Sequence, residues 1–264
     1  MEVIRKGVRL ITAAVFLALL SLISAGNPGK ACAADQKTLE LGKKVFSQRC
    51  IICHGDKGDG KGLVGIIHRY QKKGSVHDIL PRDFTTGVFR FRTTSTGCLP
   101  VDEDLLRVLS SGIPRSYMPS FDDVPLDERK AVIQYVKTFA KRWKEEEACP
   151  PMVVKKPEFV GSLESIAKGK ELYKKMKCWE CHGEFGKGDG PKSDNLKDDW
   201  GIKVLPFDFT SGATKMGFSP ENVFIAYSTG LDGSGMPSYE DSMSEQDRWH
   251  LVSYTLVLMG RVKQ

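Results

Sequence analysis

Several features are scarce in this 264-residue sequence, and their scarcity limits the folds and functions that it can have. Only five histidines and seven cysteines are present, and just one long apolar stretch occurs, at the N-terminus. Runs that alternate apolar and polar residues are missing, which argues against a fold rich in β-strands. A hydrophobic content of 41% and a charged content of 27% are typical of a soluble globular protein.

The N-terminal stretch has the pattern of an export signal. Three basic residues (Arg5, Lys6, Arg9) precede an apolar core over residues 10–20, and small residues end in Ala31-Cys32-Ala33, a cleavage-site pattern. The apolar residues of 10–25 fall short of the ~20 needed to span a bilayer. We therefore predict a signal peptide over 1–33, with membrane association through an uncleaved anchor as the alternative.

The charge gives no sign of a nucleic-acid partner. The whole chain carries a formal charge of +6, which falls to +3 when residues 1–33 are removed. No nucleic-acid-binding motif occurs in the sequence. We expect no nucleic-acid binding.

Four of the cysteines lie in two copies of a C-x-x-C-H motif. The copies are Cys50-Ile51-Ile52-Cys53-His54 and Cys178-Trp179-Glu180-Cys181-His182. Each places two thiols one helical turn apart, suited to the two vinyl groups of a haem, with the adjacent histidine suited to the iron. Zinc sites and redox dithiols also use C-x-x-C. However, 124 residues separate Cys53 from Cys178, and no βαβ pattern is present. The motifs predict two covalently attached haem c groups.

The surroundings of the first motif recur in order around the second, which predicts two domains of one type. The matched segments are Gly42-Lys43-Lys44-Val45-Phe46 with Gly169-Lys170-Glu171-Leu172-Tyr173, Gly58-Asp59-Gly60 with Gly188-Asp189-Gly190, and Pro81-Arg82-Asp83-Phe84-Thr85 with Pro206-Phe207-Asp208-Phe209-Thr210. A helical stretch then ends at Gly112 or Gly230, and six residues later comes Met-Pro-Ser.

The repeated methionines are the candidates for the sixth iron ligand. Met118 and Met236 share the context Gly-x5-Met-Pro-Ser, which places a soft thioether on a short loop after a helix. We therefore predict His54 and Met118 as axial ligands in the first domain, and His182 and Met236 in the second. Other histidines (His68, His77, His250) lack this repetition and are expected at surface or packing positions.

The periodicity predicts an all-α fold. Helices are expected over 38–49 and 164–177, each leading into a C-x-x-C-H motif, and Ser219 and Ser244 resemble N-caps of later helices. The predicted organisation is a signal over 1–33, a first domain over 34–143, a linker over 144–163 and a second domain over 164–264. The two remaining cysteines, Cys98 and Cys149, are either a disulfide or free thiols.

From these motifs, the chain resembles the class I cytochrome c family, in a tandem dihaem form similar to cytochrome c4-like proteins. The resemblance covers residues 36–260. It implies that a glycine and an aromatic on the first helix of each domain face an aromatic on the last helix. The matching residues are Gly42, Phe46 and Tyr135 in the first domain, and Gly169, Tyr173 and Tyr254 in the second.

The resemblance also implies a proline carbonyl beside each proximal histidine, for which Pro81 and Pro206 are the candidates. The first domain departs from the second between Phe84 and Pro100, where Arg90 and Arg92 occur. These two cations either bind haem propionates or belong to a solvated basic loop.

Histidine and methionine together fill both axial positions of a haem iron, which favours one-electron transfer over binding of a substrate. The prediction is an exported, periplasmic electron carrier or electron-transfer subunit that is not itself an enzyme. Its expected partners are redox proteins or a membrane oxidoreductase complex. The alternative is a dihaem peroxidase-type enzyme in which one methionine ligand is labile.

Overall fold

A computed structural model describes residues 34–70, 76–212, 214–217 and 219–263. The predicted export signal, residues 1–33, lies outside these described residues. Within the described ranges, no helix combines the length and hydrophobicity required to cross a bilayer.

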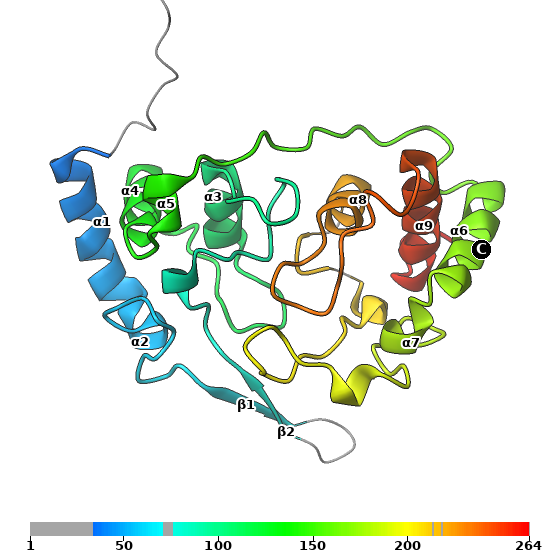
Figure 1. The fold of residues 1–264 in the computed structure, drawn as a ribbon, viewed down its shortest axis with the longest axis horizontal. Helices are drawn as coiled ribbons and strands as arrows, with labels where there is room; N and C mark the ends of the chain where they lie inside the picture. Colours follow the sequence, from blue (N-terminus) through cyan, green and yellow to red (C-terminus); the bar gives the residue numbers. More distant parts are fainter. Residues whose placement is uncertain (1–33, 71–75, 213, 218, 264) are drawn as a thin grey trace, which may run out of the picture. The chain divides into compact units, whose positions relative to one another are not determined.

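Helices dominate both halves of the chain, so the predicted all-α class is confirmed (Figure 1). In the first half the helices are α1 (Gln36–Arg49), α2 (Ile51–His54), α3 (Asp102–Ser111), α4 (Leu126–Lys137) and α5 (Arg142–Glu145), with a 3-10 turn at Phe84–Thr86. In the second half they are α6 (Leu163–Lys175), α7 (Trp179–His182), α8 (Pro220–Thr229) and α9 (Glu245–Leu258), with 3-10 turns at Ser193–Asn195 and Phe209–Ser211. The same order of elements therefore occurs twice.

One small sheet departs from the helical prediction. Strands β1 (Ile67–Tyr70) and β2 (Val76–Ile79) pair antiparallel, with Ile67 opposite Ile79. Each strand has four residues, too few to produce a clear alternating pattern in the sequence. The second half has a shorter counterpart in the same place before Pro206, where Lys197 pairs antiparallel with Lys203 and the Val204 amide donates to the Leu196 carbonyl at 3.0 Å. In the first-half hairpin, exposed His68 binds Asp78 at 2.6 Å.

Helices α1 and α4 of the first half, and α6 and α9 of the second, pack closely because a glycine lies between the helices of each pair. A Cβ on Gly42 would overlap the Ala131 carbonyl oxygen of α4, and one on Gly169 would overlap the His250 carbonyl oxygen of α9. Next to these glycines, the Phe46 and Tyr135 rings lie 5.5 Å apart.

The Tyr173 and Tyr254 rings occupy the same place in the second half, 5.4 Å apart. The glycine and aromatic pattern implied by the resemblance is confirmed in both domains. His250 is buried between these helices, where its Nδ1 lies 2.8 Å from the Ser165 hydroxyl, which confirms the expected packing role.

The predicted N-caps also form. The Ser219 hydroxyl accepts a hydrogen bond from the Asn222 amide at 3.1 Å, and Pro220 takes the first position of α8. The Ser244 hydroxyl accepts from the Asp247 amide at 3.1 Å at the start of α9. These caps satisfy amide groups that the helix itself leaves unpaired.

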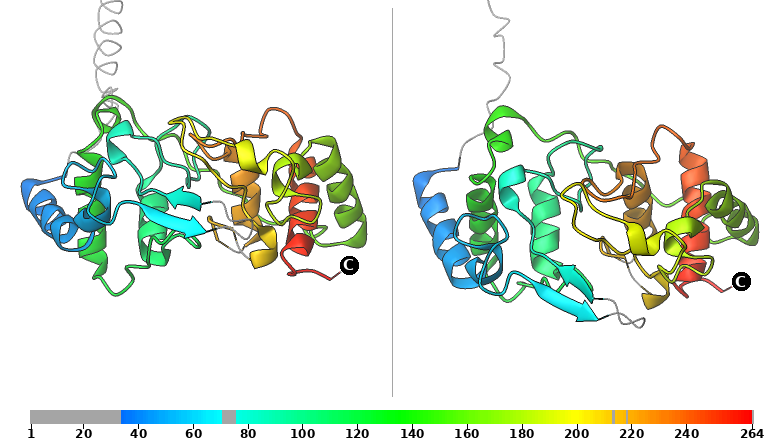
Figure 2. Two further views of the ribbon diagram at one scale, coloured as in Figure 1. Left: turned by 90° about the horizontal axis from the view of Figure 1, so that it is seen from below. Right: turned by 60° about the horizontal axis from the view of Figure 1, so that its bottom comes forward.

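The segment between α5 and α6 crosses from one half to the other without a helix or strand over residues 146–162 (Figure 1). Figure 2 shows α1 and α4 at one end of the described chain and α6 and α9 at the other, with α3 and α8 between them. A disulfide between Cys98 and Cys149 ties the start of this segment to the first half. The Met152 amide then donates to the Thr93 carbonyl at 2.7 Å.

Candidate haem sites

Each C-x-x-C-H motif occupies a single helical turn. In the first half, the His54 amide donates to the Cys50 carbonyl at 2.9 Å, and the Cys50 amide in turn donates to the Phe46 carbonyl of α1. In the second half, the His182 amide donates to the Cys178 carbonyl, also at 2.9 Å. The turn places two thiols and one imidazole beside the same space.

The ring of each histidine is oriented by a backbone carbonyl. His54 Nδ1 lies 3.1 Å from the Arg82 carbonyl oxygen, and His182 Nδ1 lies 3.1 Å from that of Phe207. A carbonyl only accepts, so Nδ1 carries the proton and Nε2 keeps its lone pair for a metal.

The carbonyls that orient the histidines come from the residues after the prolines, so the assignment of Pro81 and Pro206 was wrong by one position. A Cβ on Gly60 would come within 2.9 Å of the Pro81 oxygen, and one on Gly188 within 2.7 Å of the Pro206 oxygen. The proline carbonyls thus pack against glycines, which turns the next carbonyl toward the imidazole.

The same segments also supply an aromatic ring to each histidine, a role that sequence reasoning missed. Phe84 stacks on His54 with ring centroids 4.4 Å apart, and Phe209 stacks on His182 at 4.6 Å. The preceding aspartate of each segment caps the 3-10 turn that positions this ring. Conservation of the Asp-Phe-Thr triplet between the repeats was the available signal.

The structure shifts the correspondence of the repeated glycines by two positions. The Phe84 amide donates to the Gly58 carbonyl at 2.7 Å, whereas the Phe209 amide donates to the Gly186 carbonyl at 2.7 Å. Gly58 therefore corresponds to Gly186 rather than to Gly188. Sequence matching aligned the two Gly-Asp-Gly triplets because their residues are identical. The register in the structure is set instead by the glycine carbonyl that accepts the hydrogen bond from Phe84 or Phe209.

The two candidate methionines lie in loops of matching construction. The Ile113 amide donates to the Met118 carbonyl at 3.0 Å, and the Leu231 amide donates to the Met236 carbonyl at 3.1 Å. Each loop follows a glycine with positive φ, 66° at Gly112 and 63° at Gly230. A side chain there would be strained and would also meet the returning backbone of the loop.

The serine of each Met-Pro-Ser triplet fastens the loop to the preceding helix. The Ser120 hydroxyl donates to the Ser110 carbonyl at 2.6 Å, and the Ser238 hydroxyl donates to the Ser228 carbonyl at 2.5 Å. The repeated Met-Pro-Ser motif is thus a structural unit that holds a methionine thioether in a fixed position.

One cavity of about 1740 Å³ brings the predicted site residues of both halves together. Its lining contains the cysteines and histidines of the two motifs and both loop methionines: Cys50, Cys53, His54, Met118, Cys178, Cys181, His182 and Met236. Each half contributes paired thiols, an imidazole with a free Nε2 and a thioether, which together fit haem c.

Burial affects the titration of these groups. It is the main cause that lowers the pKa of His54 and of His182, in each case against the opposing effect of the backbone hydrogen bond. Burial also raises the pKa of the Cys50 and Cys178 thiols to about 11. A lowered pKa favours the neutral imidazole, which is the form that binds a metal.

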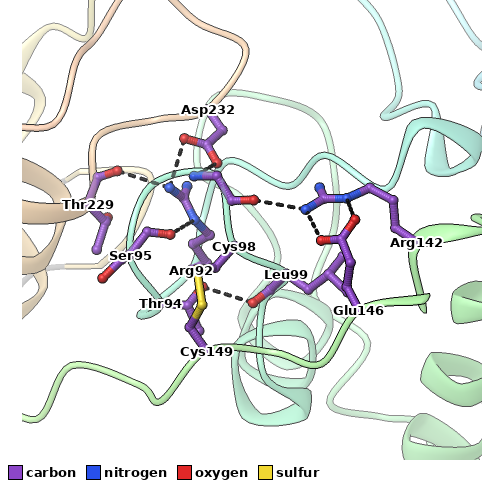
Figure 3. Close-up of a disulfide and its surroundings, with 11 residues drawn as sticks. Arg92, Thr94, Ser95, Cys98, Leu99, Arg142, Glu146, Cys149, Thr229 and Asp232 are labelled. Carbon is purple, nitrogen blue, oxygen red and sulfur yellow. Dashed lines mark hydrogen bonds and ion pairs between the residues drawn. A yellow bond between two sulfur atoms is a disulfide. The ribbon is translucent and has the colours of Figure 1, made fainter. Parts of the chain in front are cut away.

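Arg92 does not reach the cavity, which corrects its predicted contact with a propionate. Its side chain is fully buried and joins the two halves: Nη2 donates to Asp232 at 2.7 Å and to the Thr229 carbonyl at 3.0 Å (Figure 3). Its other guanidinium nitrogens donate to carbonyl oxygens of its own loop. The sequence showed only that Arg92 belongs to a basic loop, because its partners Thr229 and Asp232 lie about 140 residues further along the chain.

Arg90 lines the cavity but is also bound by protein oxygens. Its Nη2 donates to Asp198 at 2.8 Å and to the Gly233 carbonyl at 3.1 Å, while its buried Nε has no hydrogen-bond partner among the described residues. Arg90 therefore contributes to the contact between the halves and leaves one donor at the edge of the cavity.

Two helical halves, each with a C-x-x-C-H turn and a methionine loop on one cavity, define a c-type cytochrome. The family models agree: the one described as cytochrome C oxidase, cbb3-type, subunit III matches residues 37–136, and the one described as cytochrome c matches residues 166–258.

Among solved structures, the chain is similar to one from the reducing HAO-like protein complex of Kuenenia stuttgartiensis. The two are 36% identical with a TM-score of 0.74, and the match covers 85% of this chain and 96% of that one. No curated protein sequence gives a significant match. The chain belongs to the c-type cytochromes, with two cytochrome c domains in tandem, and it carries two covalently bound haem c groups.

Proposed function

We propose that this protein is an exported electron-transfer subunit, which passes single electrons between redox partners within a multiprotein complex. The observation that carries the proposal is the duplicated site on one shared cavity. Each bound haem supplies an iron that alternates between ferrous and ferric states. Cys50, Cys53, Cys178 and Cys181 would form the thioether attachments.

The axial ligands in this proposal are His54 with Met118, and His182 with Met236. Arg82 and Phe207 hold the imidazoles through their carbonyls, and the two serine-fastened loops hold the thioethers. Rigid ligands on both sides keep small molecules away from the metal and reduce the rearrangement that accompanies a change in charge. This argues for a carrier rather than for the peroxidase-type alternative.

The likeness to a chain of the HAO-like complex supports a subunit rather than a free shuttle, because the match spans nearly the whole of that chain. Export to the periplasm is supported by the Cys98–Cys149 disulfide, since such bonds persist in oxidising compartments. The partners that we propose are redox proteins of such a complex.

Carbon monoxide binding to the reduced holoprotein tests the closed sites. We expect no rapid binding by the wild-type protein, and one equivalent bound by Met118→Ala and by Met236→Ala. The matched control is Met216→Leu, because Met216 is a buried methionine of the same cavity that lies outside both loops. Stoichiometric binding by the wild-type protein would favour the peroxidase-type enzyme.

Purification from the native membrane and periplasmic fractions tests the subunit role. We expect the holoprotein to elute with a larger redox protein at low ionic strength. Elution as a single chain under all salt conditions would indicate a shuttle instead.

A further inference from the structure

The two haem sites are not equivalent, and the first difference lies beside the proximal histidines. The carbonyl that holds His54 belongs to Arg82, whereas the one that holds His182 belongs to Phe207. Arg82 places its guanidinium 5.0 Å from the ring centroid of Trp200, between the two halves. A cation thus stands next to the first proximal ligand, whereas the second site has a phenyl ring there, with the Arg115 guanidinium 5.8 Å from the centroid of that ring.

The cations near the two sites differ in the carboxylates that are bound to them. Asp198 is bound to Arg90 at 2.8 Å, and Asp83 caps Thr85 in the same way that Asp208 caps Thr210 at the second site. Asp208, the counterpart of Asp83, also faces the Arg115 guanidinium at 3.4 Å. Both of these side chains are about one-third exposed. Among the ion pairs of the described residues, Arg115 thus has a bound carboxylate and Arg82 has none, so the half-buried cation without an ion pair stands at the first site.

The second difference lies in the cavity wall. Three positions that are apolar in the first half carry tyrosine in the second; the pairs are Phe46 with Tyr173, Leu109 with Tyr227, and Phe121 with Tyr239. The hydrogen bonds establish the last two correspondences, because the Phe121 amide donates to the Leu109 carbonyl as the Tyr239 amide donates to the Tyr227 carbonyl. The reverse occurs once, where the exposed Tyr117 precedes Met118 and Gly235 precedes Met236.

Both differences act in the same direction. Oxidation of a haem iron adds one positive charge, which a nearby cation opposes and an apolar wall fails to solvate. Of the three phenols, Tyr173 donates to the Gly183 carbonyl and Tyr227 lies 2.6 Å from the Thr255 hydroxyl, so Tyr239 supplies the dipole that solvates the charged state. The ferrous state is thus favoured at the first site relative to the second.

We infer that Arg82 and the apolar wall give the site of His54 the higher reduction potential, so that electrons run from the site of His182 to the site of His54. This inference rests on the proposed electron-transfer function. Each transfer oxidises the iron at the second site and reduces the iron at the first, and no proton or atom is exchanged. A one-electron donor protein would act at the second domain and a one-electron acceptor protein at the first.

Redox titration of the holoprotein, followed by optical and NMR spectra, tests this order. We expect two one-electron steps, the higher of which belongs to the first site. Met118→His and Met236→His assign the steps, since exchange of methionine for histidine lowers the potential of the altered site. If the assignment places the higher step at the second site, or if the two steps coincide, the inference is overturned.

The variant Arg82→Gln removes the charge and keeps the backbone carbonyl. At a fixed applied potential, we expect the ratio of reduced to oxidised iron at the first site to fall on the order of tenfold. This corresponds to a reduction potential lower by about 59 mV for a one-electron step. Arg82→Lys should restore most of this ratio, and the control Lys130→Gln, at an exposed cation of α4 outside the cavity lining, should leave the first step in place. An unchanged first step in Arg82→Gln would overturn the role of Arg82.

A reciprocal exchange tests the wall without relying on Arg82. Phe121→Tyr should lower the first step and Tyr239→Phe should raise the second, each by about threefold in the ratio of reduced to oxidised iron. Changes in the opposite directions would contradict the inference. A holoprotein that fails to cycle reversibly would instead refute the proposed electron-transfer function itself, so the two failures are distinguishable.

Discussion

One carboxylate, that of Asp232, binds several groups of the other half, and its removal tests this part of the contact between the halves. Asp232 accepts three hydrogen bonds: from Arg92 Nη2 at 2.7 Å, from the Thr96 hydroxyl at 2.8 Å and from the Gly97 amide at 2.9 Å. The first two share Oδ1, and the third uses Oδ2. The substitution Asp232→Asn keeps the size of this side chain but removes its charge.

Two costs follow from this geometry. Arg92 is fully buried, so its cation is out of reach of water. The substitution removes the only acidic partner that Arg92 has among the hydrogen bonds of the described residues. If the amide oxygen takes the place of Oδ1, the amide nitrogen faces the Gly97 N–H, so that two donors oppose each other. Loss of one partner of a buried ion pair costs about 3–5 kcal/mol. The Asp232 side chain is 16% exposed, so we expect the lower figure, about 3 kcal/mol.

Urea unfolding of the holoprotein, followed by circular dichroism, measures this loss. The control is Asp241→Asn, an exposed aspartate of the same half, which should change the free energy of unfolding by less than about 0.5 kcal/mol. A loss below about 1 kcal/mol for Asp232→Asn would refute the reasoning, because it would mean that Arg92 is not held in a dry interface.

Three further outcomes are expected from the described contacts. Removal of the disulfide in the double variant Cys98→Ser, Cys149→Ser opens a loop with a sequence separation of 51 residues and should cost about 4 kcal/mol of unfolding free energy at 25 °C. Gly169→Ala should destabilise the second domain by about 1–3 kcal/mol, since the added Cβ overlaps a carbonyl oxygen of α9, whereas Gly235→Ala meets only an ordinary contact and should be near neutral. Burial lowers the pKa of His250 below its ordinary value of 6.5, so the folded state binds this proton less readily than the unfolded state, and stability should fall as the pH drops through and below about 6.5. His250→Gln should flatten that part of the pH profile, and an unchanged profile would count against the burial of this imidazole.

Local chemistry made much of the site predictable. The C-x-x-C-H motif and the Gly-x5-Met-Pro-Ser motif each specify a short-range structure, and the structure builds both as single units at the cavity. The caps at Ser219 and Ser244 were readable for the same reason, since a cap involves residues only three positions apart. Repetition added the correspondence between the halves.

Prediction failed where a contact depends on the path of the backbone. Pro81 and Arg82 are neighbours, and only the packing of the Pro81 carbonyl against Gly60 decides which of the two carbonyls reaches His54. The basic loop likewise gave no sign that Arg92 would be buried against Asp232 instead of meeting a haem propionate.

The sequence by itself determined that the chain is a tandem pair of cytochrome c domains, because covalent attachment and axial ligation each require particular residue types at fixed spacing. Only the tertiary structure decided how the two sites differ. The position of Arg82 against Trp200, and the tyrosines that line one half of the cavity, depend on segments brought together from distant parts of the chain. Charge and polarity act through space, so the order of the residues along the chain does not reveal which haem they influence.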